Sequence, residues 1–115
     1  KHKAILFTQS DNAAYKNTTT VTLKPGENNC KQVLDYLWQQ NILSLLIEGG
    51  SIAIQNYFEQ NLWDEIRYFV GNKRFLNGVK APEIKGVPNY SESIGNSMLN
   101  FLFANYPIDN FNENL

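Results

Sequence analysis

Residues 44–51 (SLLIEGGS) constrain the fold of this chain more than any other stretch of its sequence. Three apolar residues at 45–47 have the composition of a buried strand, and a carboxylate and two glycines follow them at once. Ser51 then opens a segment in which apolar side chains recur at helical spacing. An apolar strand that turns through glycines into a helix is typical of an α/β fold.

The remaining sequence carries strand and helix signals in alternation. Residues 4–8 form a continuous apolar run that ends in a threonine, and residues 19–24 are rich in β-branched side chains. The Gly95-Asn96 pair has the composition of a hairpin turn. We therefore expect strands at residues 4–8, 19–24, 44–47 and 66–70, helices at about 29–40 and from residue 51, and a hairpin of residues 90–94 and 97–104.

Both expected helices carry signals at their ends. Asn29 and Gln32 have the spacing of a capping box, which predicts Asn29 as the N-cap of the first helix. Ser51 is expected to cap the second helix. Asn41 and Asn61, each followed by a large apolar residue, predict left-handed residues just after the two helices.

This order of elements predicts an α/β sheet with parallel central strands, crossover helices and a C-terminal antiparallel hairpin. In such a sheet, ligands bind outside the carboxyl ends of the strands. The irregular connection at residues 71–90 holds three glycines and two prolines, and connections of that length are often functional. We expect one domain at residues 1–104 and an Asn-rich tail at 105–115.

Composition excludes several classes of protein. Ten basic and eleven acidic residues give a formal net charge of −1, which argues against a nucleic-acid binder that relies on phosphate neutralisation. One cysteine, Cys30, excludes an internal disulfide framework, and one histidine, His2, excludes a His-based metal cluster. Cys30 is expected to be a core residue. Because no apolar run has membrane-spanning length and no signal peptide is visible, we expect a soluble cytoplasmic protein.

The glycine turn has the chemistry of a phosphate site. The first N–H groups of a helix point outward with a positive dipole, and glycines let an anion approach the backbone. Residues 49–52 therefore suit a nucleotide pyrophosphate, with Glu48 positioned to accept hydrogen bonds from sugar hydroxyls. The alternative is a tight strand-to-helix turn with a solvated glutamate. A bare glycine pair is neither the three-glycine dinucleotide fingerprint nor a phosphate loop, so spacing alone leaves both readings open.

Residues 44–82 closely resemble the reductase domain of the bifunctional riboflavin-biosynthesis deaminase–reductase family. The resemblance extends more loosely from Ile5 to Ala104. The family pattern is an apolar strand, Glu-Gly-Gly, a helix that ends in a Phe, and Leu-x-Asp-Glu before the next strand. The matching residues are Glu48, Gly49, Gly50, Phe58, Leu62, Asp64 and Glu65.

The resemblance implies a dihydrofolate-reductase-like fold and NADPH-dependent reduction of 5-amino-6-(5-phosphoribosylamino)uracil to its ribitylamino product. It implies that Gly49, Gly50, Ser51 and Ile52 hold the cofactor phosphates and that Glu48 lies near the substrate's sugar chain. Thr8 and Gln9 would lie near the adenosine half of the cofactor. It implies no metal site in this chain, and the sequence identifies no general acid.

The chain also departs from the family. Gly71-Asn72 stands where Ala-Pro is usual, and a single glycine, Gly78, stands where a pair is common. The strands and helix that begin the family domain, with its substrate-phosphate residues, have no counterpart here, nor does the zinc deaminase. We therefore expect this chain to be the C-terminal, cofactor-binding part of a reductase domain, inactive alone.

Two alternatives remain open: a non-catalytic fragment or interaction module of the same fold, and a dihydrofolate-type reductase. In the sequence at 97–104, apolar residues occupy positions on both faces of the expected strand. A strand with one solvated face alternates more regularly between apolar and polar residues. This pattern predicts a homodimer formed through the C-terminal hairpin.

Overall fold

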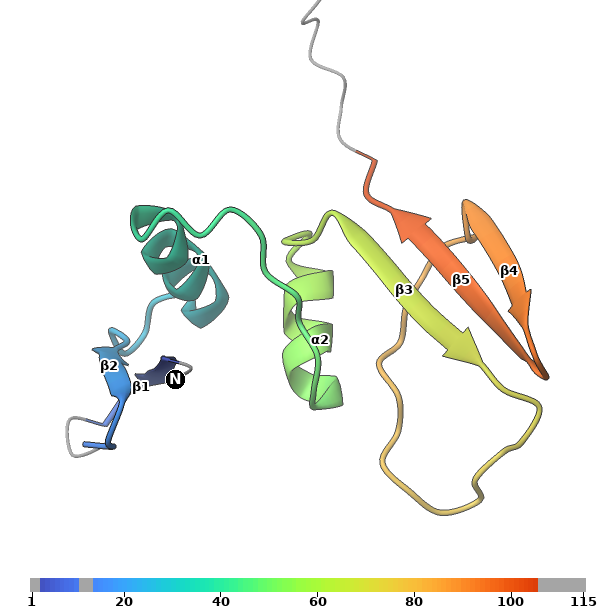
Figure 1. Ribbon diagram of the computed structural model, residues 1–115, viewed down its shortest axis with the longest axis horizontal. Helices are drawn as coiled ribbons and strands as arrows, with labels where there is room; N and C mark the ends of the chain where they lie inside the picture. The colour runs from blue at the N-terminus through green and yellow to red at the C-terminus, as the bar shows by residue number, and fades with distance from the viewer. Residues whose placement is uncertain (1–2, 11–13, 106–115) are drawn as a thin grey trace, which may run out of the picture. The chain divides into compact units, whose positions relative to one another are not determined.

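The computed structural model describes residues 3–10 and 14–105. His2 and the tail beyond Asn105 lie outside the described residues. The chain divides into two compact units, Lys1–Ile47 and Glu48–Leu115, and each is described by itself (Figure 1).

The first unit contains two strands and a helix. Strands β1 (Ala4–Thr8) and β2 (Thr18–Thr22) pair in parallel, with Ala4 opposite Thr18 and Thr8 opposite Thr22. Helix α1 (Asn29–Gln39) follows. Buried Leu23, Cys30 and Leu37 form its core, which confirms the structural role expected for Cys30. The rings of Phe7 and Tyr36 meet edge-on at 5.5 Å, which joins β1 to α1.

The C-terminal end of α1 is the one that the sequence predicts, whereas its N-cap differs. The N-cap is Asn28, not Asn29, because the Asn28 side chain accepts the Lys31 N–H at 3.1 Å. Gln32 does not reach back to the cap: its amide bonds both backbone groups of Lys24, at 2.8 and 3.2 Å. The left-handed residue expected after the helix is confirmed, since Asn41 has a φ of 59°.

The strand expected at residues 44–47 is not formed. These residues have no regular secondary structure, and Leu45 and Leu46 are 45% and 79% exposed. An apolar run becomes a strand only where a neighbouring strand can accept and donate its backbone hydrogen bonds. The structure pairs no described residue with this segment, which instead leads to the boundary between the units.

The second unit contains a helix and a three-stranded antiparallel sheet (Figure 1). Its elements are α2 (Ser51–Glu59), β3 (Glu65–Val70), β4 (Tyr90–Ile94) and β5 (Ser97–Phe103). The strand order is β3-β5-β4. Asn61 has a φ of 55° and Leu62 donates its N–H to the Tyr57 carbonyl at 3.0 Å, so the expected end of α2 is confirmed.

The two faces of this sheet differ in burial. Asn100 and Leu102 are buried on one face, and the Asn100 side chain accepts a hydrogen bond from the Ser91 hydroxyl at 2.6 Å. The hairpin expected around Gly95-Asn96 is confirmed, with Gly95 at a φ of 58°. That φ at the first turn position suits a glycine.

The chain is therefore an α/β protein with parallel and antiparallel strands, as expected. Its described strands belong to two sheets, and the segment at 44–47 adds a strand to neither. Among the described residues, no helix combines the length and apolarity needed to span a membrane.

Candidate functional site

The glycine turn leads directly into α2. Gly49 has a φ of 120°, a conformation that favours glycine. Gly50 is the N-cap of the helix, with a φ of −41° and a ψ of 139°, and no side chain caps the helix. Ser51 is thus the first helical residue rather than the cap, which corrects the expectation from the sequence.

The space around the two glycines is open. An added Cβ at either position would meet no other atom within 4 Å. The first hydrogen bond of the helix runs from the Ile54 N–H to the Gly50 carbonyl at 3.3 Å. The N–H groups before Ile54 therefore have no acceptor within the helix. An anion can therefore approach these N–H groups and the positive end of the helix dipole.

Glu48 immediately precedes the turn and is exposed. Gly49 to Ile52 follow it without interruption, so the structure keeps these five predicted site residues together. Since no strand ends at Ile47, the turn joins a segment without regular secondary structure to a helix, not a central strand to a helix.

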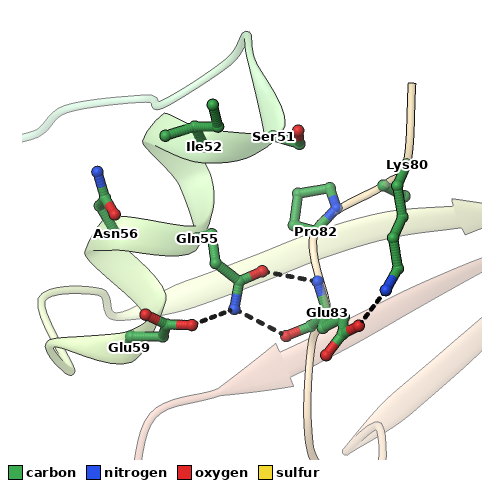
Figure 2. A pocket seen from close by; sticks show the side chains of 9 residues that line it. Ser51, Ile52, Gln55, Asn56, Glu59, Lys80, Pro82 and Glu83 are labelled. Carbon is green, nitrogen blue, oxygen red and sulfur yellow. Dashed lines mark hydrogen bonds and ion pairs between the residues drawn. The ribbon is translucent and has the colours of Figure 1, made fainter.

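A pocket of about 350 Å³ lies beside α2 (Figure 2). Its two walls are one side of the helix and the 80–83 segment of the long connection before β4. The lining residues are Ser51, Ile52, Gln55, Asn56, Glu59, Lys80, Ala81, Pro82 and Glu83. Two residues of the glycine turn and first helical turn, Ser51 and Ile52, therefore open onto the pocket.

Gln55 connects the two walls. Its side-chain oxygen accepts the Glu83 backbone N–H at 2.7 Å, and its side-chain nitrogen donates to the Glu83 carbonyl at 3.4 Å (Figure 2). The same nitrogen donates to the Glu59 carboxylate at 3.0 Å. The glutamine amide thus pairs with the backbone of Glu83 as another peptide group would.

Lys80 and Glu83 form an ion pair on the second wall. The Lys80 ammonium hydrogen-bonds the Glu83 carboxylate, which lowers the pKa of Glu83 and raises the pKa of Lys80. Both side chains are largely exposed, so the pair contributes little to stability.

The two ends of the pocket differ in the charge of the groups that line them. Its Ser51 end lies at the helix N-terminus, where an anion is favoured. Farther along, the lining holds the carboxylates of Glu59 and Glu83 and the ammonium of Lys80, which pairs with Glu83, so a second anion is disfavoured there. Hydroxyl and amide groups suit this part better, because carboxylates accept hydrogen bonds from both.

Thr8 and Gln9 belong to the first unit, where both make local contacts. The Thr8 hydroxyl accepts the Ser10 N–H at 3.0 Å, and the Thr8 carbonyl accepts the Leu23 N–H at 2.7 Å. The Gln9 side chain donates to the Asn29 side chain at 3.3 Å. These bonds organise the end of β1, and the cofactor contact expected of the two residues stays a prediction.

Sequence reasoning missed Gln55, Lys80 and Glu83. One signal for Gln55 was present: the polar residues Ser51, Gln55 and Glu59 recur every four positions, which places them on one side of a helix. The 71–90 connection was expected to be functional, but nothing in its sequence indicates that residue 83 pairs with residue 55.

Three comparisons with known proteins bear on this chain. The family described as the RibD C-terminal domain matches residues 1–79. No curated protein matches the chain. A solved structure that matches is a diaminohydroxyphosphoribosylaminopyrimidine deaminase/5-amino-6-(5-phosphoribosylamino)uracil reductase from Thermotoga maritima, with a TM-score of 0.69 and 22% sequence identity.

The structural match covers 88% of this chain and 30% of the Thermotoga maritima chain. This chain therefore spans less than a third of the length of that protein. The likeness confirms the α/β fold class and is consistent with the dihydrofolate-reductase-like type expected from the sequence. Because the family match covers residues 1–79, well over half of the sequence, the chain belongs to the RibD C-terminal domain family.

Proposed function

We propose that this chain is the cofactor-binding part of an NADPH-dependent reductase of riboflavin biosynthesis. The reaction is reduction of 5-amino-6-(5-phosphoribosylamino)uracil to the 5-phosphoribitylamino product. Membership of the family supports this proposal, and the Thermotoga maritima protein of matching fold is named for the same substrate. The observation that carries it is the open glycine turn at the N-terminus of α2, beside a pocket.

The residues of the turn suit a cofactor phosphate. Gly50 has a φ that any residue adopts, and no neighbouring atom excludes a Cβ there. Local structure therefore does not require glycine at this position, whereas close approach of a phosphate to the backbone does. Ser51 and Ile52 follow with N–H groups at the positive end of the helix. In this proposal Glu48 contacts the substrate's sugar chain, and Thr8 and Gln9 contact the adenosine half.

NADPH supplies the hydride, so the protein contributes binding and alignment of donor and acceptor carbons. The chain spans 30% of the matching protein, and we propose that the residues for the substrate phosphate lie in a part of the reductase that it does not cover. We therefore propose that the isolated chain binds NADPH but shows no measurable turnover with substrate. Robust steady-state reduction by this chain alone would contradict the proposal of a part-domain.

The test of the phosphate site is Gly50→Val, with NADPH affinity and thermal unfolding measured on the same samples. The branched side chain fills the approach to the first-turn N–H groups, so we expect NADPH affinity to fall at least tenfold, about 1.4 kcal/mol. Gly78→Val is the matched control, because Gly78 also has open space around its Cβ position and lies outside the pocket lining. Wild-type affinity in a folded Gly50→Val protein sinks the proposal, and the glycines are then only a turn.

We also propose a homodimer in the cytoplasm. Cross-strand pairing places Arg67, Tyr90 and Phe101 on the sheet face opposite Asn100 and Leu102. Phe69 and Phe103 share that face, which we call the aromatic face, and are 65% and 46% exposed. Exposed aromatic clusters of this kind favour a partner surface. Family membership supports the cytoplasmic location.

A further inference from the structure

We infer that Gln55 is a positioning residue, which holds the 80–83 segment against α2 and so keeps the second wall of the pocket in place for the cofactor. This inference rests on the proposed function, because it assigns Gln55 a task within the same site. Gln55 acts through the backbone of Glu83 and needs no contact with a ligand of its own.

The contact between Gln55 and Glu83 joins parts of the chain that are far apart in sequence. Residues 55 and 83 are separated by 28 positions, and two hydrogen bonds of 2.7 and 3.4 Å link them. A side-chain amide that bonds both backbone groups of one residue fixes the position and the orientation of that residue. The third bond, to Glu59 at 3.0 Å, orients the glutamine itself within the helix.

The loop that carries Glu83 is held at its end, where Asn89 bonds the backbone of Phe101 and Phe103, but its first part is largely exposed. Residues 71–89 form no regular secondary structure. Large apolar side chains do not anchor the part of the loop before Lys80, since Phe75, Leu76 and Val79 are 90%, 96% and 91% exposed. A loop with few buried contacts opens locally at low free-energy cost. The bonds from Gln55 therefore matter more here than the same bonds would in a packed core.

The contact also places a charge. Glu83 is fixed by its backbone, and its carboxylate binds the Lys80 ammonium (Figure 2). Lys80 and Ser51 both line the pocket. Gln55 thus positions, through the backbone of Glu83, the residue with which the cation of the second wall pairs.

The first unit supplies an internal control. Gln32 of α1 bonds both backbone groups of Lys24 at 2.8 and 3.2 Å, in the same two-bond arrangement. Neither Gln32 nor Lys24 lines the pocket beside α2. Removing the Gln32 amide therefore removes an equivalent pair of bonds away from the pocket beside α2.

The experiment compares Gln55→Met with Gln32→Met in the full 115-residue chain. Methionine keeps the length and helix propensity of glutamine but makes no hydrogen bond with the loop. Limited digestion with trypsin reports opening of the loop through cleavage of the Lys80–Ala81 bond. NADPH affinity and thermal unfolding are measured on the same proteins.

For Gln55→Met we expect cleavage after Lys80 to be at least about fivefold faster and NADPH affinity to be about three- to tenfold weaker, as the loss of two modest hydrogen bonds implies. Gln32→Met should change neither. Glu59→Gln should leave cleavage unchanged, because the new amide oxygen can still accept the hydrogen bond that orients Gln55.

The outcomes separate this inference from the proposed function. Unchanged cleavage in Gln55→Met shows that the amide does not hold the loop, and it overturns the inference alone. Faster cleavage with wild-type NADPH affinity leaves Gln55 a purely structural residue, which also overturns the inference alone. Failure of the wild-type chain to bind NADPH overturns the proposed function, and with it the task assigned to Gln55.

Discussion

Gly49 and Gly50 are adjacent in sequence, yet only Gly49 has a backbone conformation that favours glycine. The φ of Gly49 is 120°, whereas that of Gly50 is −41°. Both have open space where a Cβ would lie. The pair therefore separates two reasons for a glycine at a turn. At Gly49 the reason is the backbone conformation, and at Gly50 it is the access that a ligand has to the backbone.

This difference predicts unequal effects of substitution at the two positions on stability. Gly49→Ala places a side chain in a strained conformation and should lower the free energy of unfolding by about 1–3 kcal/mol. Gly50→Ala should change it by less than about 1 kcal/mol, since only the preference for an N-cap residue is affected. Urea unfolding of the two variants beside wild type measures both values. Equal losses would contradict the assignment of conformation to Gly49 and access to Gly50.

The ion pair on the pocket wall predicts a pH dependence. Lys80, through its hydrogen bond and charge, lowers the pKa of Glu83 below its ordinary value of 4.5, and Lys85 adds a smaller effect of the same sign. A lowered pKa means that this carboxylate favours the folded state above pH 4.5 and loses that contribution as pH falls through its folded pKa. Titration followed by NMR should place the Glu83 midpoint below 4.5, and Lys80→Met should raise it more than Lys85→Met does.

Much of the fold follows from local sequence. The asparagines at 41 and 61 predict the left-handed residues that end both helices, because each sits between a helical stripe and a large apolar side chain. Gly95 predicts the hairpin, because its turn position needs a positive φ, which glycine adopts readily. These features depend on a few neighbouring residues, so a sequence alone determines them.

The segment at 44–47 shows where local reasoning stops. Its apolar run has the composition of a buried strand, but a strand also needs a neighbouring backbone, and no described residue provides one. The same limit applies to the pocket. The glycine turn is visible in the sequence, whereas the contact between Gln55 and Glu83 depends on how a 19-residue loop, residues 71–89, returns to the helix.

The aromatic face predicts association. Phe103 is 46% exposed and lies opposite Glu65 in the sheet, at the end of β5. Phe103→Lys should weaken a dimer by adding a charge to an apolar contact, whereas Ser93→Lys, on β4 and on the opposite face, should not. Analytical ultracentrifugation over a range of concentrations measures the equilibrium. A wild-type chain that remains monomeric at high concentration refutes the proposed dimer.

Glu48 and the glycine turn lie side by side in the chain but have different proposed partners. Glu48 is exposed and stands two residues before the N-cap, so its carboxylate is not one of the groups at the helix N-terminus.

We expect Glu48→Gln to leave the NADPH affinity of this chain within about twofold of wild type, because the amide keeps the side chain's shape and an acceptor oxygen. In the proposed full-length reductase, the same change should raise the KM for substrate and leave the KM for NADPH unaltered, since a carboxylate accepts stronger hydrogen bonds from sugar hydroxyls than an amide does. Steady-state kinetics with each substrate varied in turn measures both constants. A rise in the KM for NADPH alone would move Glu48 to the cofactor side of the site and refute its proposed contact with the sugar chain.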